Sequence, residues 1–383
     1  MSVTGPHGFR AAGVTAGLKT SGLPDVALVV NDGPRYAAAG VLTSNRVKAA
    51  PVRWTEQVLT YGALRAVVLN AGGANACTGP AGFADTHRTA EAVAESLGCG
   101  AVEVAVCSTG LIGERLPMDR LLGGVDKAVA ALSDGGGDDA AEAIRTTDTR
   151  AKQVLVRSGD VVLGGMAKGA GMLAPGLATM LCVLTTDAVA DPADLDAALR
   201  AAVRLTFDRV DTDGCMSTND TVLLMASGAS RRRLGSDELQ TLVHAGCADL
   251  AQQLVADAEG ASKQVRIEVR HAASEDEAVT VARAVARSNL LKCALHGSDP
   301  NWGRVLAAVG TTDATFDPDA LDVAFNGVWV CRQGSIGTDR SAVDLAGRDV
   351  AITVDMHAGD ATGHVVTTDL TADYVHENSA YST

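Results

Sequence analysis

The chain has 383 residues, of which 47% are hydrophobic, enough for a large core shared by two or three subdomains. Its formal net charge is −14, and lysine and arginine form no cluster, which argues against binding to nucleic acid or to an anionic membrane. Apolar runs stay shorter than the roughly 18 residues of a membrane-spanning helix, and the first residues contain no apolar signal segment. We therefore expect no membrane partner and no signal peptide.

The eight cysteines and eight histidines show no spacing typical of a metal site. Several cysteines, such as Cys107 and Cys182, lie in apolar segments that resemble buried strands. We expect reduced and mostly buried thiols, a cytoplasmic protein, and no bound metal.

Strand-like and helix-like segments alternate along the chain, a pattern typical of layered α/β proteins. Buried strands are expected at 24–30, 64–69, 102–107 and 178–184, and helices at 83–97, 117–132 and 236–258. An acidic loop at 134–139 should lead into a short helix ending near residue 144. Further on, we expect a half-exposed strand at 265–270, a capped helix from 274 to about 287, and a hairpin or sheet at 350–354 and 363–367.

The most informative segment is a glycine-rich stretch that starts at Gly164, carries Lys168, and passes through a Pro175-Gly176 turn into Ala178-Thr179 and a strand. Thr179 lies where the loop becomes the strand, a place where the backbone can be held in an unusual geometry. A threonine hydroxyl is a weak nucleophile without a base, and cleavage before the residue would supply its own α-amine. That amine has a reference pKa of about 7.7–8.0 and is partly neutral in the cell.

Other interpretations of the same glycines are weaker. No lysine here is followed by Ser or Thr as a phosphate-binding P-loop requires. Residues 169–174 match the pattern G-x-G-x-x-A of dinucleotide sites, but Pro175 and Gly176 would break the helix that such a pattern opens. A plain loop between two strands remains the alternative.

Three further segments could carry chemistry. Asn70–Cys77 follows a strand and predicts either a ligand site or an asparagine-stabilised turn. Thr109 and Gly110 follow another strand and could donate to an oxyanion, or form an ordinary turn. Glu259 stands with Asp257 at the end of a helix, where acids oppose the macrodipole; it is a functional carboxylate or a surface acid compensated by Lys263.

A last segment, Gly297–Arg304, packs turn residues, a carboxylate, an arginine and a tryptophan into eight positions. This composition favours a structured loop at a site or interface. His296, just before it, has no acid or nucleophile partner that the sequence indicates, so we expect a structural role.

Together, these segments resemble the glutamate N-acetyltransferase/ornithine acetyltransferase family of arginine biosynthesis, also called the ArgJ family. The resemblance covers essentially the whole chain in the family's order. It rests on the motifs Asn70–Gly79, Ser108–Gly113, Thr146–Thr149, Lys168–Met172, Ala178–Leu181, Ser217–Thr221, Asp257–Gly260, Gly297–Arg304 and Glu377–Tyr381. Departures are small. Gly176 stands where the family often has a polar residue, and Gly73 stands where it often has an asparagine.

The resemblance implies a self-processing αββα architecture with a smaller C-terminal α/β lobe from about residue 265. Cleavage between Ala178 and Thr179 would give an α chain, residues 1–178, and a β chain, residues 179–383, assembled as α2β2. Thr179 would be the nucleophile, and Thr109 and Gly110 the oxyanion hole. The residues implied to line the substrate site are Thr146, Lys168, Thr179, Glu259, Asn378 and Thr383.

The implied reaction moves an acetyl group from N2-acetyl-L-ornithine to L-glutamate by way of an acetyl ester on Thr179. In this interpretation Glu259 contacts the substrate amine and Lys168 its carboxylate, and no cofactor or metal takes part. Acetyl-CoA is a second candidate donor, although the sequence contains no separate CoA signature. The alternatives are an amide hydrolase with the same nucleophile and a small-ligand binding protein that is never cleaved.

Overall fold

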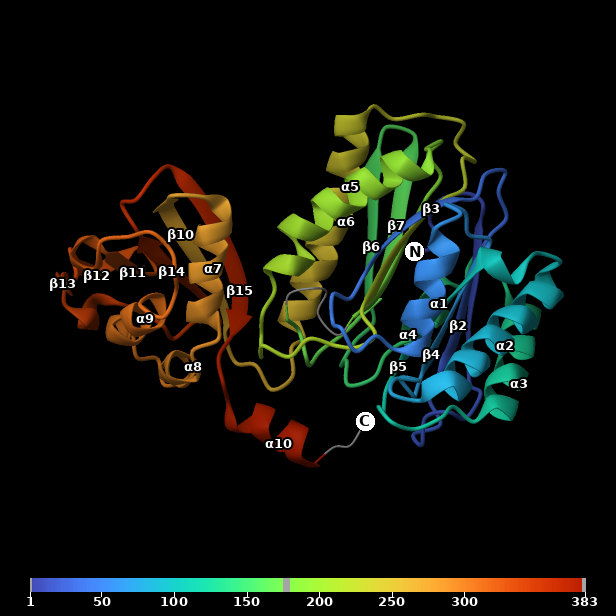
Figure 1. Cartoon of the computed structure of the whole chain (residues 1–383), viewed down its shortest axis with the longest axis horizontal. Helices are drawn as coiled ribbons and strands as arrows, with labels where there is room; N and C mark the ends of the chain where they lie inside the picture. Colours follow the sequence, from blue (N-terminus) through green and yellow to red (C-terminus); the bar gives the residue numbers. More distant parts are fainter. Residues whose placement is uncertain (1, 175–179, 381–383) are drawn as a thin grey trace.

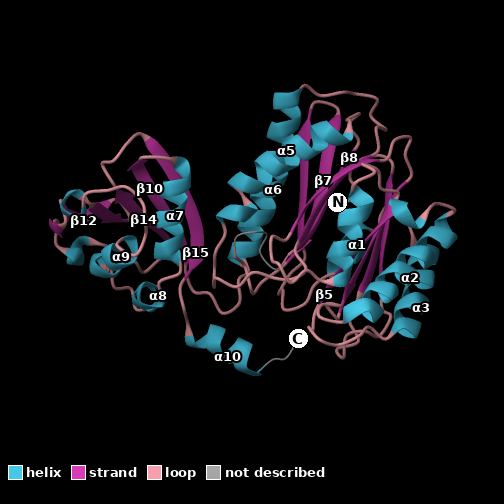
Figure 2. Ribbon diagram, viewed as in Figure 1, coloured by secondary structure: helices cyan, strands magenta, loops and turns pink. Residues whose placement is uncertain are grey.

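The computed structural model describes residues 2–174 and 180–380. Within these residues, two β-sheets are stacked between layers of helices, and a separate lobe with a third sheet follows (Figure 1). Helices lie against sheets throughout, as Figure 2 shows, so the expected layered α/β class is confirmed. No helix in the described part of the chain is long and apolar enough to cross a membrane.

The first sheet has the strand order β1-β2-β4-β5, with β4 and β5 parallel and the other pairs antiparallel. Its inner strands are fully buried and mainly aliphatic, as expected for strands covered on both faces. The strands are β1 (Phe9–Val14), β2 (Val26–Asn31), β4 (Ala66–Ala71) and β5 (Val104–Thr109).

The second sheet has the order β3-β9-β8-β7-β6, in which only β8 and β9 are parallel. Residues of both sheets, among them Val68 of β4 and Val183 of β8, share one hydrophobic core, so the sheets pack face to face. The strands are β3 (Ala37–Leu42), β6 (Lys152–Ser158), β7 (Val161–Lys168), β8 (Leu181–Thr186) and β9 (Thr221–Ala226).

Helices cover the outer faces of this pair of sheets. Helices α2 and α3 pack on the first sheet and α5 and α6 on the second, while α1 and α4 each contact both sheets. The arrangement is the αββα layering that the sequence resemblance implies. The helices are α1 (Ala50–Leu59), α2 (Gly79–Leu97), α3 (Met118–Ala131), α4 (Gly137–Ala143), α5 (Pro192–Leu205) and α6 (Ser236–Ala256).

The C-terminal lobe has its own core around a mixed six-stranded sheet of order β13-β12-β11-β14-β10-β15. Three helices, α7, α8 and α9, contribute to that core. The strands are β10 (Gln264–Ala272), β11 (Asp322–Phe325), β12 (Val328–Arg332), β13 (Ser335–Ile336), β14 (Asp349–Asp355) and β15 (Ala361–Thr368). The helices are α7 (Glu275–Ala286), α8 (Asn289–His296) and α9 (Trp302–Val309).

After β15 the chain turns back toward the two stacked sheets as the exposed helix α10 (Ala372–Ala380) (Figure 1). Thr371 Oγ1 fixes this turn by donating to the carbonyl of Gly260 at 2.6 Å. Gly260 has φ +59°, and a Cβ there would meet the Tyr374 nitrogen at 2.2 Å, so only glycine fits. Helix α10, which follows the C-terminal lobe, thereby reaches the cavity described below.

Several expected elements are confirmed with shifted ends, and others are wrong in detail. The 350–354 and 363–367 segments are strands β14 and β15, but β10 lies between them, so they form a sheet and no hairpin. Helix α4 begins at Gly137, inside the expected acidic loop, since Asp138 and Asp139 favour a helix N-terminus. Buried thiols are confirmed for Cys107 and Cys182, whereas Cys77, Cys215 and Cys293 are exposed.

The start of the glycine-rich segment is a strand and not a loop. Gly164, Gly165 and Lys168 all belong to β7, a strand in the second sheet buried throughout. A Cβ on Gly164 would lie 2.1 Å from the carbonyl oxygen of Ser2, and one on Gly165 would lie 2.6 Å from the Leu184 side chain. These glycines therefore permit close packing in a sheet. The sequence pattern gives only a weak indication of this role.

We expect Gly164→Ala to destabilise the protein by about 1–3 kcal/mol, because the added methyl group overlaps backbone that cannot move freely. Gly123→Ala, in α3 with open space around its Cβ position, is the control and should be neutral or stabilising by up to about 1 kcal/mol. Denaturant unfolding of both variants measures the difference. Equal stability of the two would contradict the close approach at Gly164.

Candidate active site

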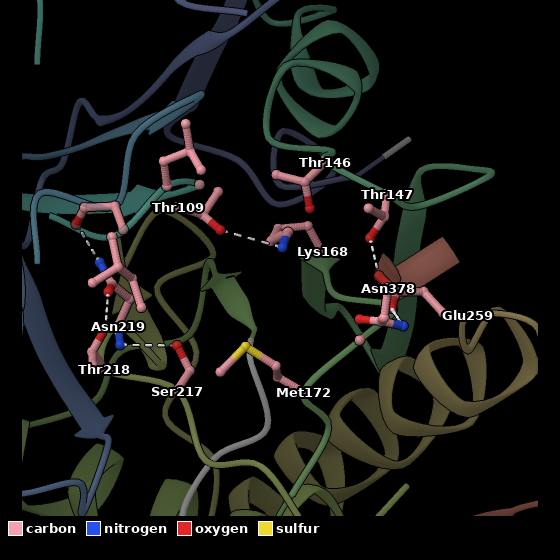
Figure 3. A pocket seen from close by; sticks show the side chains of 15 residues that line it. Thr109, Thr146, Thr147, Lys168, Met172, Ser217, Thr218, Asn219, Glu259 and Asn378 are labelled. Atoms are coloured by element: carbon pink, nitrogen blue, oxygen red, sulfur yellow. Dashed lines mark hydrogen bonds between the residues drawn. The ribbon is translucent and has the colours of Figure 1, made fainter. Parts of the chain in front are cut away.

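A cavity of ≈ 310 Å³ lies where β5 and β7 end and where the chain enters β9 (Figure 3). It is lined by residues from both stacked sheets, from the turn after α6 and from α10. The lining residues are Ala74, Thr109, Gly110, Leu111, Ile112, Thr146, Thr147, Lys168, Gly171, Met172, Ser217, Thr218, Asn219, Glu259 and Asn378. The cavity thus brings together Thr109, Gly110, Thr146, Lys168, Glu259 and Asn378, six residues that the sequence resemblance assigns to one site.

Thr109 ends β5 of the first sheet and faces Lys168, which ends β7 of the second (Figure 3). Lys168 Nζ donates to Thr109 Oγ1 at 3.3 Å, and the lysine side chain is almost fully buried. Gly110 follows at φ +130°, where a Cβ would lie 2.5 Å from the Gly73 nitrogen. The geometry therefore requires glycine beside Thr109 and leaves the cavity open at this turn.

Lys168 belongs to a buried group of two lysines and two aspartates. Lys152 Nζ donates at 2.6 Å to both Asp148 Oδ1 and Asp257 Oδ2 and is fully buried. Asp148 also accepts the backbone N–H of Gly169 at 2.7 Å and that of Thr146 at 3.0 Å. One aspartate thus fixes both the segment after β7 and the turn that carries Thr146.

Charge interactions within this group set two pKa values. Burial by itself would raise the pKa of Asp148, but the charges of Lys168 and Lys152 outweigh it and lower that pKa to about 2. Burial also lowers the pKa of Lys168, and the charge of Asp148 partly restores it. The cavity therefore contains a buried lysine whose charged form is favoured by the Asp148 carboxylate.

Glu259 lies on the opposite wall, after the end of α6 (Figure 3). Thr147 Oγ1 donates to Glu259 Oε1 at 2.6 Å, and Asn378 Nδ2 of α10 donates to Oε2 at 3.0 Å. A Cβ on Gly171 would lie 2.3 Å from that carboxylate, which explains why a glycine stands there. Glu259 is a carboxylate directed into the cavity, so its interpretation as a surface acid compensated by Lys263 is wrong.

Lys263 and Asp257 have other partners. Lys263 Nζ donates to the carbonyls of Leu345 and Gly347 in the C-terminal lobe. Asp257 binds Lys152 and accepts the backbone N–H of Thr149 at 3.0 Å. The charge of Asp257 at the end of α6 is thus offset by a buried lysine of β6, a contact with no signature in the sequence.

Other segments from the sequence analysis lie outside the cavity or only partly in it. Asn70 stabilises its turn by donating to the carbonyl of Gly73 at 3.0 Å, and only Ala74 of that segment lines the cavity. No residue of the 297–304 loop is among the described lining residues, so its expected place at the site is not found; Asn301 instead caps α9. His296 contacts Asp369 at 3.1 Å, an acid partner that the sequence does not indicate.

Three of the sequence predictions, Ala178, Thr179 and Thr383, lie outside the described residues. The nearest described neighbour of Thr179 is Met180, whose backbone N–H donates to Asp220 Oδ1 at 2.9 Å. The sequence did not indicate the roles of Thr147, Asp148 and Asp220, although all three belong to the motifs Thr146–Thr149 and Ser217–Thr221. The concentration of hydroxyl and carboxylate residues in those motifs was the only available signal.

Comparisons with known proteins agree with this assembly of motifs. The model of the ArgJ family matches residues 10–383. The "Arginine biosynthesis bifunctional protein ArgJ" of Streptomyces coelicolor is 65% identical over 382 residues, covering 100% of both chains. The protein of the same name from Mycobacterium tuberculosis is 61% identical over 388 residues, covering 99% of this chain and 96% of the relative.

Among solved structures, an ornithine acetyltransferase from Mycobacterium tuberculosis, crystallised with ornithine, is 65% identical. The match covers 47% of this chain and 96% of that one, with a TM-score of 0.45. The family model and the full-length relatives carry the assignment. The chain belongs to the ArgJ family.

Proposed function

We propose that the protein is an acetyltransferase of arginine biosynthesis that moves an acetyl group from N2-acetyl-L-ornithine to L-glutamate. Membership of the ArgJ family supports the reaction class. The observation that carries the proposal is the cavity in which Thr109, Gly110, Lys168 and Glu259 surround one small volume. A volume of ≈ 310 Å³ suits an amino acid with a short acyl group.

In this proposal the chain cleaves itself between Ala178 and Thr179, and the new α-amine of Thr179 takes the proton from its own Oγ. The Oγ attacks the acetyl carbonyl, Thr109 and Gly110 stabilise the oxyanion, and L-ornithine leaves with the returned proton. The amine of L-glutamate then attacks the acetyl ester, which releases N-acetyl-L-glutamate and regenerates Thr179. Two half-reactions through one ester predict ping-pong kinetics.

The opposite charges of the cavity fit a zwitterionic substrate. Glu259 is oriented by Thr147 and Asn378 and would hold a substrate ammonium group. Lys168, beside Thr109, would hold a carboxylate or support the oxyanion donors. Thr146 and Thr383 would complete the substrate contacts. No cofactor or metal has a part in this scheme.

We further propose that acetyl-CoA is a second acetyl donor and that the two chains form an α2β2 assembly. Acetyl-CoA would acylate the same threonine, and formation of acetylglutamate from acetyl-CoA and glutamate without acetylornithine is the assay for it. The two chains of residues 1–178 and 179–383 would remain together as a cytoplasmic α2β2 assembly. An amide hydrolase with the same nucleophile would instead pass the acetyl group to water, so the yield of acetylglutamate per ornithine separates the two functions.

We expect purified protein to give two masses, which correspond to residues up to 178 and from 179 onward, in an intact-mass spectrum. Thr179→Ala should give one uncut chain without transfer activity, since it lacks the hydroxyl that both steps use. Thr179→Ser keeps a hydroxyl and is the matched control, with slower but measurable cleavage. A stable single mass for the wild type, or full activity of Thr179→Ala, would overturn the proposed nucleophile.

Glu259→Gln should raise the KM for acetylornithine by about 10-fold to 100-fold, because one ionic contact with the substrate ammonium becomes neutral. Chain cleavage should proceed as in the wild type, because the substrate takes no part in it. Steady-state kinetics with both substrates check this expectation. An unchanged KM with a reduced kcat would assign Glu259 to the chemical step and not to substrate binding.

A further inference from the structure

Asp220 is a buried carboxylate that the proposed mechanism does not use. The residue is fully buried at the start of β9, directly after the cavity residues Ser217, Thr218 and Asn219. Its Oδ1 accepts the Met180 N–H at 2.9 Å. Its Oδ2 has no hydrogen-bond partner in the described part of the chain. A buried carboxylate oxygen without a partner is costly, which calls for an explanation.

The register of the second sheet places Asp220 beside the catalytic segment. Strands β8 and β9 are parallel, with Leu181 opposite Thr221, so Asp220 lies alongside Met180. The Thr221 N–H donates to the Met180 carbonyl at 3.1 Å, so the Asp220 side chain and the next peptide group together hold Met180. These contacts fix the residue to which Thr179 is covalently bonded.

Covalent geometry limits where the α-nitrogen of Thr179 can be. Only Cα and the carbonyl carbon separate it from the Met180 nitrogen, so the two nitrogens lie within about 4 Å in any conformation. The Met180 nitrogen is in turn 2.9 Å from Asp220 Oδ1. Cleavage before Thr179 would therefore create a new amine within about 7 Å of Asp220 Oδ1, in a carboxylate whose Oδ2 has no hydrogen-bond partner among the described residues.

We propose that Asp220 is a positioning residue for the amino terminus that cleavage creates, its Oδ1 holding the Met180 N–H and its Oδ2 accepting a hydrogen bond from the Thr179 α-amine. The inference rests on the proposed function. The hydrogen bond would orient the amine lone pair toward Thr179 Oγ. It would also stabilise the ammonium group that forms while Oγ attacks, as the acid does in a nucleophile–base–acid arrangement. Asp220 itself gains and loses no proton during transfer.

The electrostatic surroundings of Asp220 agree with this role. Burial raises its pKa well above the ordinary value, and the opposing effects come from the Met180 N–H, from the charge of Lys168 on β7 and from Ser217. Burial thus disfavours the ionised form of this carboxyl group in the uncut chain. An ammonium group at the new terminus would supply the missing counter-charge and favour the ionised form.

The test is Asp220→Asn. The amide can still accept the Met180 N–H, but the group at the Oδ2 position becomes a donor that cannot accept from the amine. We expect cleavage to proceed, since the amine exists only afterwards, and kcat for acetyl transfer to fall about 100-fold or more. The acidic limb of the kcat–pH profile should move to lower pH by about 1, because an ammonium group without its counter-charge has a lower pKa.

Asp187→Asn is the matched control. Asp187 is equally buried at the other end of β8, where it accepts the Val162 N–H at 2.9 Å and contacts the cavity nowhere. The Asp187→Asn variant should be less stable, but the acidic limb of its kcat–pH profile should not move. Should Asp220→Asn fail to fold, Asp220→Glu and Asp220→Gln form a second pair, whose side chains are equally long. Only the Glu variant should keep the acidic limb of the wild-type kcat–pH profile.

Three results would overturn the inference. The first is an unshifted pH limb in a processed Asp220→Asn enzyme, and the second is an identical limb in the Glu and Gln variants. The third is loss of cleavage in Asp220→Asn but not in Asp187→Asn, which would assign Asp220 to processing. Failure of the proposed function is distinct, since it would leave the wild type uncut or Thr179→Ala active.

Discussion

The bond network of the buried Asp148 carboxylate is the constraint on which the site depends. Asp148 binds Lys152 and the Gly169 and Thr146 N–H groups, and its charge acts on Lys168. Lys152 extends the network to Asp257, at the end of α6 and two residues before Glu259. Removing one partner of such a buried ion pair typically costs about 3–5 kcal/mol, since the other charge is left unpaired. One charge cluster therefore positions the Thr146 turn, the end of β7 and the Glu259 turn together.

The two stacked sheets explain how residues far apart in sequence form one cavity. Thr109 comes from the first sheet and Lys168 from the second, and both end their strands on the same side of the shared core. The C-terminal lobe adds Asn378 through α10, with the Thr371 to Gly260 contact as its fixed point. The stacked sheets thus supply the reacting groups of the proposed mechanism, and the lobe supplies a contact that orients Glu259.

The sequence predicted the layered α/β class, because strand and helix patterns are local signals. The family resemblance named six residues that the structure brings into one cavity. Thr109, Lys168 and Glu259 stood out by type and position. The glycines of β7 were misassigned to a loop, since close packing against Ser2 is a tertiary contact that local pattern does not contain. Lys152 looks like an ordinary residue of an alternating strand, and only the fold shows it buried between Asp148 and Asp257. Asp220 likewise becomes informative only through the β8–β9 register.

In the proposed reaction the acetyl group passes through an ester on Thr179, and that ester can be trapped. Purified enzyme is mixed with acetylornithine in the absence of glutamate, quenched in acid, and analysed by intact-mass and peptide mass spectrometry. We expect one added acetyl group on the chain that begins at Thr179, located on that residue and lost when glutamate is added. Ornithine release without an acetylated chain, or acetylation at another residue, would contradict it.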